Sequence, residues 1–508
     1  MIRSVIRGLG LLPIVFLSAC VSLGPDFETP EAPVADDWME AEQAGVNYQA
    51  ADDPEWWKVF NDPVLDRLID TARSQNLSLR SAGLRVLQAN AQLGIATGRK
   101  FPQVQQITGS GSNINLSENA NDNISLLENN FALYNLDFGL SWEVDFWGRF
   151  RRMVESESAL LQAEMAGYNA MMVSLSAEVA HAYVLLRTLQ ERIALAEQNV
   201  TVQARTHKIA DVKNRNGQVT ELDVQQALTI LNRTRATIPP LQTSLNQVRN
   251  ALSLLLGILP QELGAVLDES GTMPAPPAEI AVGMPQDLIR RRPDIRRAEW
   301  MLAAQSAQIG VAVTELYPHF NIGGSIGVAT TDINGKSAGD MFDSDSISSL
   351  LFGGFTWNVF NYGTLKNNIR FQDARFQELL VDYQNLVLSA QAEVNDAIFA
   401  YLQAHAQARH LTESVAAAER SVELSLIQYR EGSADFNQVL STLTQQTEQQ
   451  DALTATNGTI AADLVTVYKV LGGGWDVGAE RSIEDYLSEQ DKQELRSRTK
   501  YWRNTLAE

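Results

Sequence analysis

Two stretches of the chain alternate between apolar and polar residues. From Phe131 to Phe146 the even-numbered residues are apolar and most odd-numbered residues are polar. The same period of two recurs from Phe320 to Val328 and continues from Leu351 to Val359. Successive side chains of a strand point to opposite faces, so this period predicts strands with one apolar and one polar face. Aromatic residues at the strand ends are typical of the aromatic girdles of a membrane β-barrel, and a soluble sandwich would not need strands this long.

Two further segments lack helix breakers over an unusual length. Residues 149–215 contain no proline and one glycine, and residues 364–431 contain neither. A helix of this length spans about 100 Å, which is more than a domain core requires. The apolar residues are widely spaced, as in helices that pack side by side in a coiled-coil-like wall. After Gly217 and Gly432 the chain is predicted to turn, and second helices run to Leu256 and Leu471.

The chain resembles itself at an offset of 215 residues. Trp142–Gly148 aligns with Trp357–Gly363, Gly217 aligns with Gly432, and Gly257 aligns with Gly472. Two structural repeats are therefore predicted, each with a helix, two strands, a very long helix, a turn and another helix. Repeat 1 covers residues 63–271, with a β-hairpin at about 101–147 and a helical hairpin at 149–256; a proline-rich linker covers 272–284; repeat 2 covers 285–475, with a β-hairpin at about 317–361 and a helical hairpin at 364–471; and 476–508 form a C-terminal tail.

The first residues have the layout of an export signal. Arg3 and Arg7 precede an apolar stretch from Leu9 to Phe16 that is too short to span a bilayer. Leu17-Ser18-Ala19-Cys20 is typical of a bacterial lipoprotein processing site, in which Cys20 becomes the lipidated first residue, and Val21 in place of Asp suits an outer-membrane address. Residues 1–19 are then the signal peptide and 20–62 a lipidated N-terminal segment. The alternative is an ordinary signal with a chance cysteine.

Composition and short motifs limit the partners and the kinds of functional site that the chain can have. The formal charge of −21 over 508 residues argues against nucleic acid as a partner. A single cysteine excludes an internal disulfide and a thiolate zinc site. The five histidines form no HExxH motif, so we expect no metal and no cofactor beyond the lipid on Cys20. Gly323–Gly327 matches the GxSxG pattern of hydrolases, but Ser325 falls on an alternating strand, so we expect no catalytic residue.

Four strands per chain set a constraint on assembly. No apolar run of 18 residues follows the signal, so a further membrane contact must be a barrel or a surface. Four strands cannot close a barrel in lipid without exposing unpaired backbone. Two copies would give an eight-stranded barrel filled by side chains, whereas three give twelve strands and a lumen. We therefore predict an α+β membrane protein, a cyclic homotrimer with a 12-stranded transmembrane β-barrel continued by a long α-helical barrel.

Several motifs in order carry a family resemblance. They are Cys20; Gly24-Pro25-Asp26-Phe27 with Pro30 and Pro33; Trp56-Trp57 with Phe60, Pro63 and Leu65; Phe101-Pro102; Trp142 to Gly148; and Arg291-Arg292-Pro293-Asp294-Ile295 with Ala298-Glu299. Together they resemble the TolC-like outer-membrane efflux proteins, more narrowly the lipoprotein branch of the OprM or NodT type. The resemblance implies a passive trimeric duct in the outer membrane of a Gram-negative bacterium, extending into the periplasm. It also implies two partners, a periplasmic adaptor and an inner-membrane pump, often of the resistance-nodulation-division class.

The resemblance also implies a gate where the helical hairpins turn. By position, the tyrosine of the gate is Tyr429 and the aspartate of the first hairpin is Asp223. The basic residue that the family has after the second turn is Ala434 here, and two expected aspartates are Gln438 and Ser441. Asp435 is a candidate to replace part of this acidic ring, with a solvated turn aspartate as the alternative. The Arg-Pro-Asp-Ile segment is expected to start a helix near Pro293.

Three functions remain open at this point. The leading hypothesis is an exit duct for small molecules such as drugs. A duct for protein secretion is an alternative that the residues do not separate from it, and a structural lipoprotein that spaces the envelope is another. A spacer has no need of four alternating strands flanked by aromatic residues, whereas a pore does.

Overall fold

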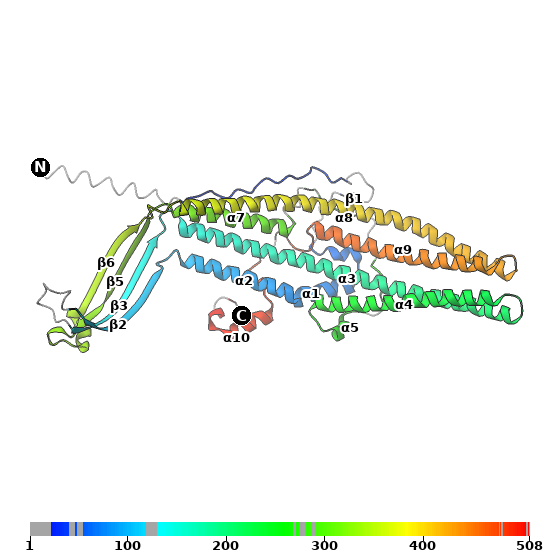
Figure 1. Ribbon diagram of the computed structural model, residues 1–508, viewed down its shortest axis with the longest axis horizontal. Coiled ribbons are helices and arrows are strands. Elements are labelled where there is room, and N and C mark those ends of the chain that lie inside the picture. The colour runs from blue at the N-terminus through cyan, green and yellow to red at the C-terminus, as the bar shows by residue number, and fades with distance from the viewer. Residues whose placement is uncertain are drawn as a thin grey trace. The chain divides into compact units, whose positions relative to one another are not determined.

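The structure of the chain is a computed structural model, drawn in Figure 1, and it describes residues 22–39, 46–47, 54–117, 130–267, 271–274, 276, 280–283, 285, 291–476, 478, 481–503 and 506. Cys20, the predicted signal peptide and the tip of the first predicted β-hairpin lie outside these residues. The elements in chain order are β1 Val46–Asn47, η2 Trp56–Phe60, α1 Pro63–Gln75, α2 Leu77–Gly98, β2 Val104–Asn115, β3 Asn130–Val144, α3 Arg149–Arg215, α4 Glu221–Leu256, η4 Pro260–Glu262, α5 Leu263–Val266, β4 Ile280–Ala281, α7 Pro293–Thr314, β5 His319–Thr331, η5 Ile333–Gly335, η6 Ala338–Phe342, η7 Ser344–Ser346, β6 Ile347–Thr356, α8 Thr364–Arg430, α9 Phe436–Val470, η8 Ile483–Tyr486, α10 Glu489–Arg498 and η9 Lys500–Trp502.

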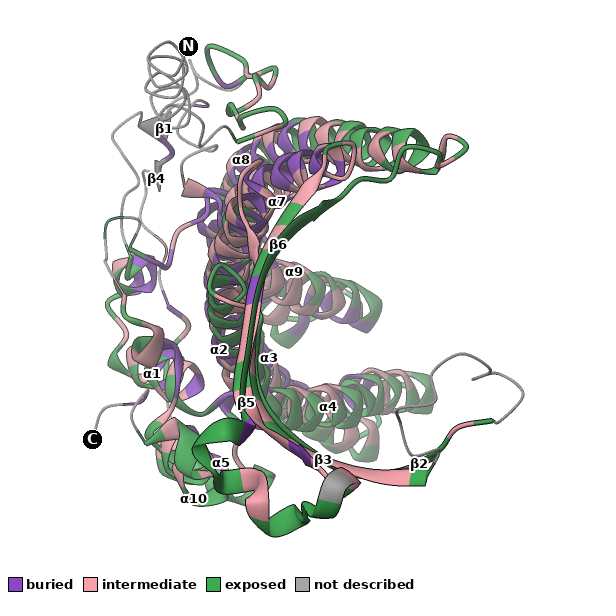
Figure 2. Ribbon diagram, turned by 90° about the vertical axis from the view of Figure 1, so that its left-hand side faces the viewer, coloured by how far each residue is buried: buried purple, intermediate pink, exposed green. Residues whose placement is uncertain are grey.

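The chain divides into two compact units. Unit 1 consists of Met1–Pro30, Leu87–Ala163 and Ala298–Asp382, and unit 2 of Glu31–Val86, Glu164–Arg297 and Tyr383–Glu508. Unit 1 holds a four-stranded antiparallel sheet with the order β2-β3-β5-β6. Figure 2 shows this sheet as a curved ribbon with β2 and β6 at its two ends. Each of these end strands has one edge that no described strand pairs.

The apolar face of the sheet is exposed. Ile107, Phe138 and Ile326 are direct cross-strand partners and therefore lie on one face. Ile107 has 73% of its surface exposed and Ile326 has 58%. On β6, Leu351 belongs to the same face and is 84% exposed. A soluble protein buries such a face, so this sheet is built for an apolar surrounding.

The polar face has one local exception. On β6, Leu350 and Phe352 pair with Ser325 and Gly323, residues of the polar face of β5. A Cβ atom on Gly323 would clash with the ring of Phe352, so the glycine leaves room for that ring. The predicted separation into one apolar and one polar face therefore holds for β3 and β5 but not for β6, which carries apolar residues on both faces.

The first described segment, which includes Leu23 to Asp26, is bonded to the start of α3. Leu23 donates its backbone N–H to the carbonyl oxygen of Trp147 at 3.1 Å. The guanidinium of Arg152, a residue only 2% exposed, donates to the carbonyl oxygen of Leu23 at 3.0 Å and to the Asp26 carboxylate at 2.7 Å. Gly24 lies so close to Gly310 of α7 that neither position has room for a larger residue. The segment from Leu23 to Asp26 is thus held by residues that follow β3.

Unit 2 contains the greater part of the long helices α3 and α8. α3 and α8 each have 67 residues, and they start at Arg149 and Thr364, where the sequence predicts long helices to begin. Figure 1 shows α4 running back beside α3, and α9 beside α8. The main core cluster includes Val179 and Leu186 of α3 and Val394 of α8, all fully buried. One window of α3 is apolar enough to cross a membrane by length and composition alone, but 61% of it is buried, as in a core helix.

Helix α4 contains two interior prolines that the prediction from the sequence did not take into account. Pro239 and Pro240 lie in the interior of this 36-residue helix, where a proline normally breaks or kinks the chain. Neither residue has an N–H, so the carbonyl groups of Arg235 and Ala236 cannot receive their usual i+4 hydrogen bonds. The corresponding positions of α9, Thr454 and Ala455, are not prolines.

The C-terminal segment packs on α2 within unit 2. Arg80 makes two hydrogen bonds to the carboxylate of Asp491, at 2.7 and 3.0 Å, and this bonding lowers the pKa of Asp491. Tyr486 packs edge-on against Tyr168, with ring centroids 4.9 Å apart. The carbonyl oxygen of Tyr486 lies directly over Gly83, so any Cβ there would clash with it. Gly83 therefore sets the distance between α2 and the C-terminal segment.

Replacing Gly83 with Ala is expected to destabilise the protein by about 1–3 kcal/mol, because the added methyl group must push the C-terminal segment away from α2. Gly94 lies in the same helix with no atom near its missing side chain, so Gly94→Ala is the matched control and should be neutral or stabilising. Thermal unfolding and limited proteolysis of residues 481–503 measure both effects. Equal behaviour of the two variants would contradict the assignment.

Candidate functional site

The two helical hairpins turn through glycines in the left-handed region. Gly217 has φ 71° and Gly432 has φ 77°. In each turn the residue after the glycine donates to a carbonyl five residues back, Gln218 to Lys213 and Ser433 to Gln428, both at 2.9 Å. This pattern ends a helix with its last carbonyls satisfied, and a side chain at either glycine would strain the backbone. The turns thus lie where the sequence predicts them.

The aspartates near the turns cap helices. The Asp223 carboxylate accepts hydrogen bonds from the backbone N–H and the hydroxyl of Thr220, both at 2.9 Å, in a capping box at the start of α4. Asp435 is the N-cap of α9 and accepts the backbone N–H of Gln438 at 3.0 Å. These contacts favour the interpretation of Asp435 as a turn aspartate. Ser441 lies further along α9, on the wall of a surface depression that also includes Glu448.

Tyr429 joins the two hairpins. Its side chain, 6% exposed, packs on Phe436 with ring centroids 5.1 Å apart. The ammonium of Lys213, on the other hairpin, lies 4.1 Å from the centroid of the Tyr429 ring and donates to the Tyr429 carbonyl oxygen at 3.2 Å. Burial raises the pKa of Tyr429, and the Asp223 carboxylate raises it further. Tyr429, one of the predicted gate residues, thus has direct contacts that reach from one hairpin to the other.

Two ion pairs join the hairpins further along. Arg192 of α3 donates to both oxygens of Asp451 of α9, at 2.8 and 2.9 Å. Arg233 of α4 contacts Glu448 of α9 at 3.1 Å, where both side chains are largely exposed. The bidentate, less exposed pair contributes more to stability than the exposed one. Sequence reasoning missed these residues because no local pattern relates positions that are 259 and 215 residues apart.

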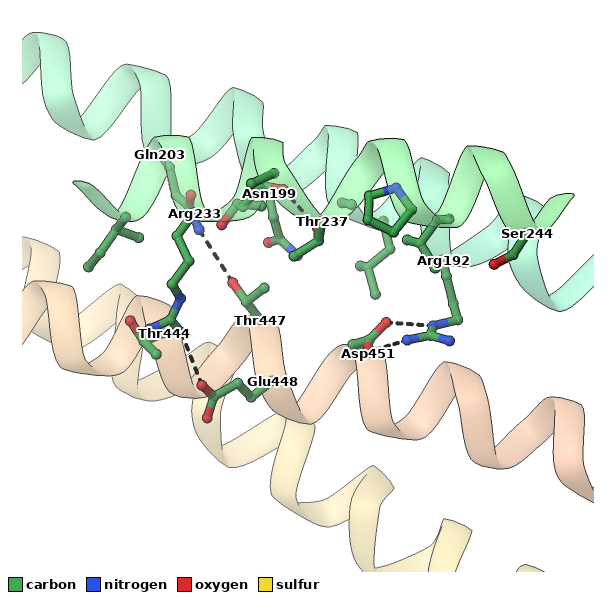
Figure 3. Close-up of a pocket in the computed structure, with 17 residues that line it drawn as sticks. Arg192, Asn199, Gln203, Arg233, Thr237, Ser244, Thr444, Thr447, Glu448 and Asp451 are labelled. Atoms are coloured by element: carbon green, nitrogen blue, oxygen red, sulfur yellow. Dashed lines mark hydrogen bonds and ion pairs between the residues drawn. The ribbon is translucent and has the colours of Figure 1, made fainter. Parts of the chain in front are cut away.

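A pocket of about 500 Å³ lies between α3, α4 and α9 and is bordered by both ion pairs (Figure 3). Gln203 lines it and is only 3% exposed. The side-chain nitrogen of Gln203 donates to Thr447 at 3.5 Å, while its carbonyl oxygen is buried with no hydrogen-bond partner among the described residues. A buried acceptor without a donor costs about 1–3 kcal/mol. In the sequence, the unusual proline pair Pro239-Pro240 of α4 marks this region, and Pro240 lines the pocket.

The described residues offer no group of three His, Cys, Asp or Glu side chains able to hold a metal ion. Ser325, the centre of the GxSxG match, lies inside β5 and not in a strand-turn-helix elbow. The contacts described at the hairpin ends are helix caps, ring packing and hydrogen bonds between the hairpins.

A model described as "Outer membrane efflux protein" matches residues 68–258 and 284–473, which together make up most of the chain. The chain belongs to the outer membrane efflux protein family. Among its relatives, Nodulation protein T of Rhizobium leguminosarum bv. viciae is 28% identical over 470 residues, with 92% of both chains covered. The probable efflux pump outer membrane protein TtgC of Pseudomonas putida is 28% identical over 476 residues, covering 92% of this chain and 95% of TtgC.

A solved structure agrees with this assignment. The outer-membrane channel OprN superimposes with a TM-score of 0.84 at 30% identity, covering 90% of this chain and all of OprN. The predicted resemblance to the OprM or NodT type is thus confirmed. This outer membrane efflux protein is an efflux channel of the outer membrane that extends into the periplasm.

We expect Lys213→Met to loosen the hairpin ends, because methionine fills similar space but cannot bond the Tyr429 carbonyl or place a charge on its ring. Loss of about 1 kcal/mol should speed hydrogen exchange around residues 426–440 about fivefold. Lys208→Met, at an exposed position of the same helix, is the control. Equal exchange in both variants would reject a joining role for Lys213.

Proposed function

We propose that three copies of the chain form one passive duct, the exit channel of a tripartite efflux system. The periplasmic end of the duct would dock on a periplasmic adaptor and an inner-membrane pump, which supply the energy. The observation that carries this proposal is the curved four-stranded sheet with an exposed apolar face and a free edge at each end. In lipid those edges must be paired, and three copies give twelve strands around a lumen.

The two-repeat interpretation supports the same architecture. The indole nitrogen of Trp142 donates to the carbonyl oxygen of Lys100 at 3.2 Å, and that of Trp357 donates to the carbonyl oxygen of Leu316 at 3.0 Å. These two bonds occupy equivalent places at the base of the two predicted hairpins. Three glycine pairs at an offset of 215 residues, 148 and 363, 217 and 432, 257 and 472, share a positive φ. We infer that each repeat adds two strands and one helical hairpin to the duct wall.

A lipid on Cys20 would give the duct its second membrane contact. Leu23, three residues further on, is bonded to Trp147 just after β3, at the base of the sheet. An acyl chain on Cys20 would therefore enter the membrane beside the strands. One lipid chain alone anchors a protein only weakly, so the lipid and the strands would act together. We propose no enzymatic activity and no cofactor beyond this lipid.

Complementation of a deletion strain tests the duct. Deleting the gene should lower the minimal inhibitory concentrations of several dyes, detergents or antibiotics severalfold, and the wild-type gene should restore them. No change across the panel, with the protein present in the parent strain, would overturn small-molecule efflux. Conductance in planar bilayers would then separate protein secretion from a spacer that conducts nothing.

Two neighbouring residues of β5 test which face of the sheet meets lipid. Ile326→Arg places a charge on the exposed apolar face and should cost about 2–4 kcal/mol of insertion, so it should not complement. Ser325→Arg places the same charge on the opposite face and should complement. Complementation by both variants would contradict a lipid-facing sheet.

A further inference from the structure

The pocket between α3, α4 and α9 has the dimensions of a ligand site. Its volume of about 500 Å³ falls in the range of small-molecule pockets in proteins. Six apolar or small side chains form much of its wall: Leu195, Ala196, Ile230, Ala236, Pro240 and Leu241. Its walls come from both hairpins, α3 and α4 on one side and α9 on the other (Figure 3). An occupant would therefore contact both hairpins at once.

The charges around the pocket balance. Arg192 and Arg233 are paired with Asp451 and Glu448, so two positive and two negative side chains leave no net charge. Figure 3 shows these pairs spanning from the α3 and α4 side to α9. A balanced pair attracts a free ion weakly, so the pocket is not built for an inorganic ion.

Among the described side chains that line the pocket, Gln203 has a buried polar atom without a partner, and this atom is an acceptor. The buried carbonyl oxygen of Gln203 has no donor among the described residues. An occupant that brings an N–H or O–H group to an apolar body would complement this wall.

We propose that this pocket binds a small, uncharged amphipathic molecule that donates a hydrogen bond to the side-chain carbonyl of Gln203. The bound molecule bridges the α3–α4 hairpin and α9, and it stabilises the arrangement in which both ion pairs are formed. Binding of this kind does not depend on conduction, so it is measured on the purified full-length protein in detergent.

The probe is N-phenyl-1-naphthylamine, an uncharged aromatic amine with one N–H whose fluorescence rises in apolar sites. After subtraction of the detergent signal, the wild type should show saturable binding. Gln203→Met should weaken binding about tenfold, because it removes the acceptor while keeping the length of the side chain. Gln198→Met makes the same change at an exposed position of α3 outside the pocket and should bind as the wild type does.

A second probe isolates the hydrogen bond. The N-methyl derivative of the same amine lacks the N–H. It should bind the wild type about as weakly as the parent amine binds Gln203→Met. The Gln203→Met variant should bind both probes with the same affinity. Ala196→Phe fills the pocket and should abolish binding of both. Circular dichroism establishes that each variant is folded; if Ala196→Phe is not, the Gln203→Met comparison decides alone. Absence of saturable binding, binding that survives in folded Ala196→Phe, or equal affinity of the two probes for the wild type would overturn the proposal.

Discussion

The free edges of β2 and β6 expose backbone N–H and C=O groups that no strand among the described residues pairs. In water such edges are tolerable, but the apolar face of this sheet, with Ile107, Ile326 and Leu351 largely exposed, belongs in lipid. An unsatisfied backbone group in lipid costs several kcal/mol, so the edges must be paired by other copies. The described sheet has only four strands, so the proposed barrel needs several copies of the chain. In the proposed trimer, the strands of all copies form one closed ring, which a sheet of four strands cannot form by itself.

The helical part is held together by contacts of a different kind. Its core is apolar, but the contacts that join the two hairpins include polar ones: Lys213 on Tyr429 near the turns, and Arg192 with Asp451 and Arg233 with Glu448 further along. Such contacts contribute little individually. The gate that the family resemblance implies requires the two hairpins to separate, and contacts of this strength would allow that separation.

Periodic features were predictable from the sequence because they are local. Alternation identified the strand ending near Phe146, the lack of breakers identified helices from Arg149 and Thr364, and glycine identified the turns. The role of Asp223 was also accessible, since Thr220 three residues earlier is a capping-box signal. By contrast, the proline rule alone would have broken α4, yet the helix continues through Pro239 and Pro240. The pairing of Arg192 with Asp451 depends on how two distant helices align, which no local pattern encodes.

Closure of the sheet by neighbouring copies is tested most directly by cross-linking its two edges. Variants would carry one cysteine in β2 and one in β6, beginning with Gln106→Cys and Leu350→Cys, which lie at the same height of the sheet, and shifting one residue at a time. Single-cysteine variants are the controls. Oxidation in membranes should link two and then three chains, with nothing larger, in at least one register. Failure to link in every register, or a ladder that continues past three chains, would contradict the account.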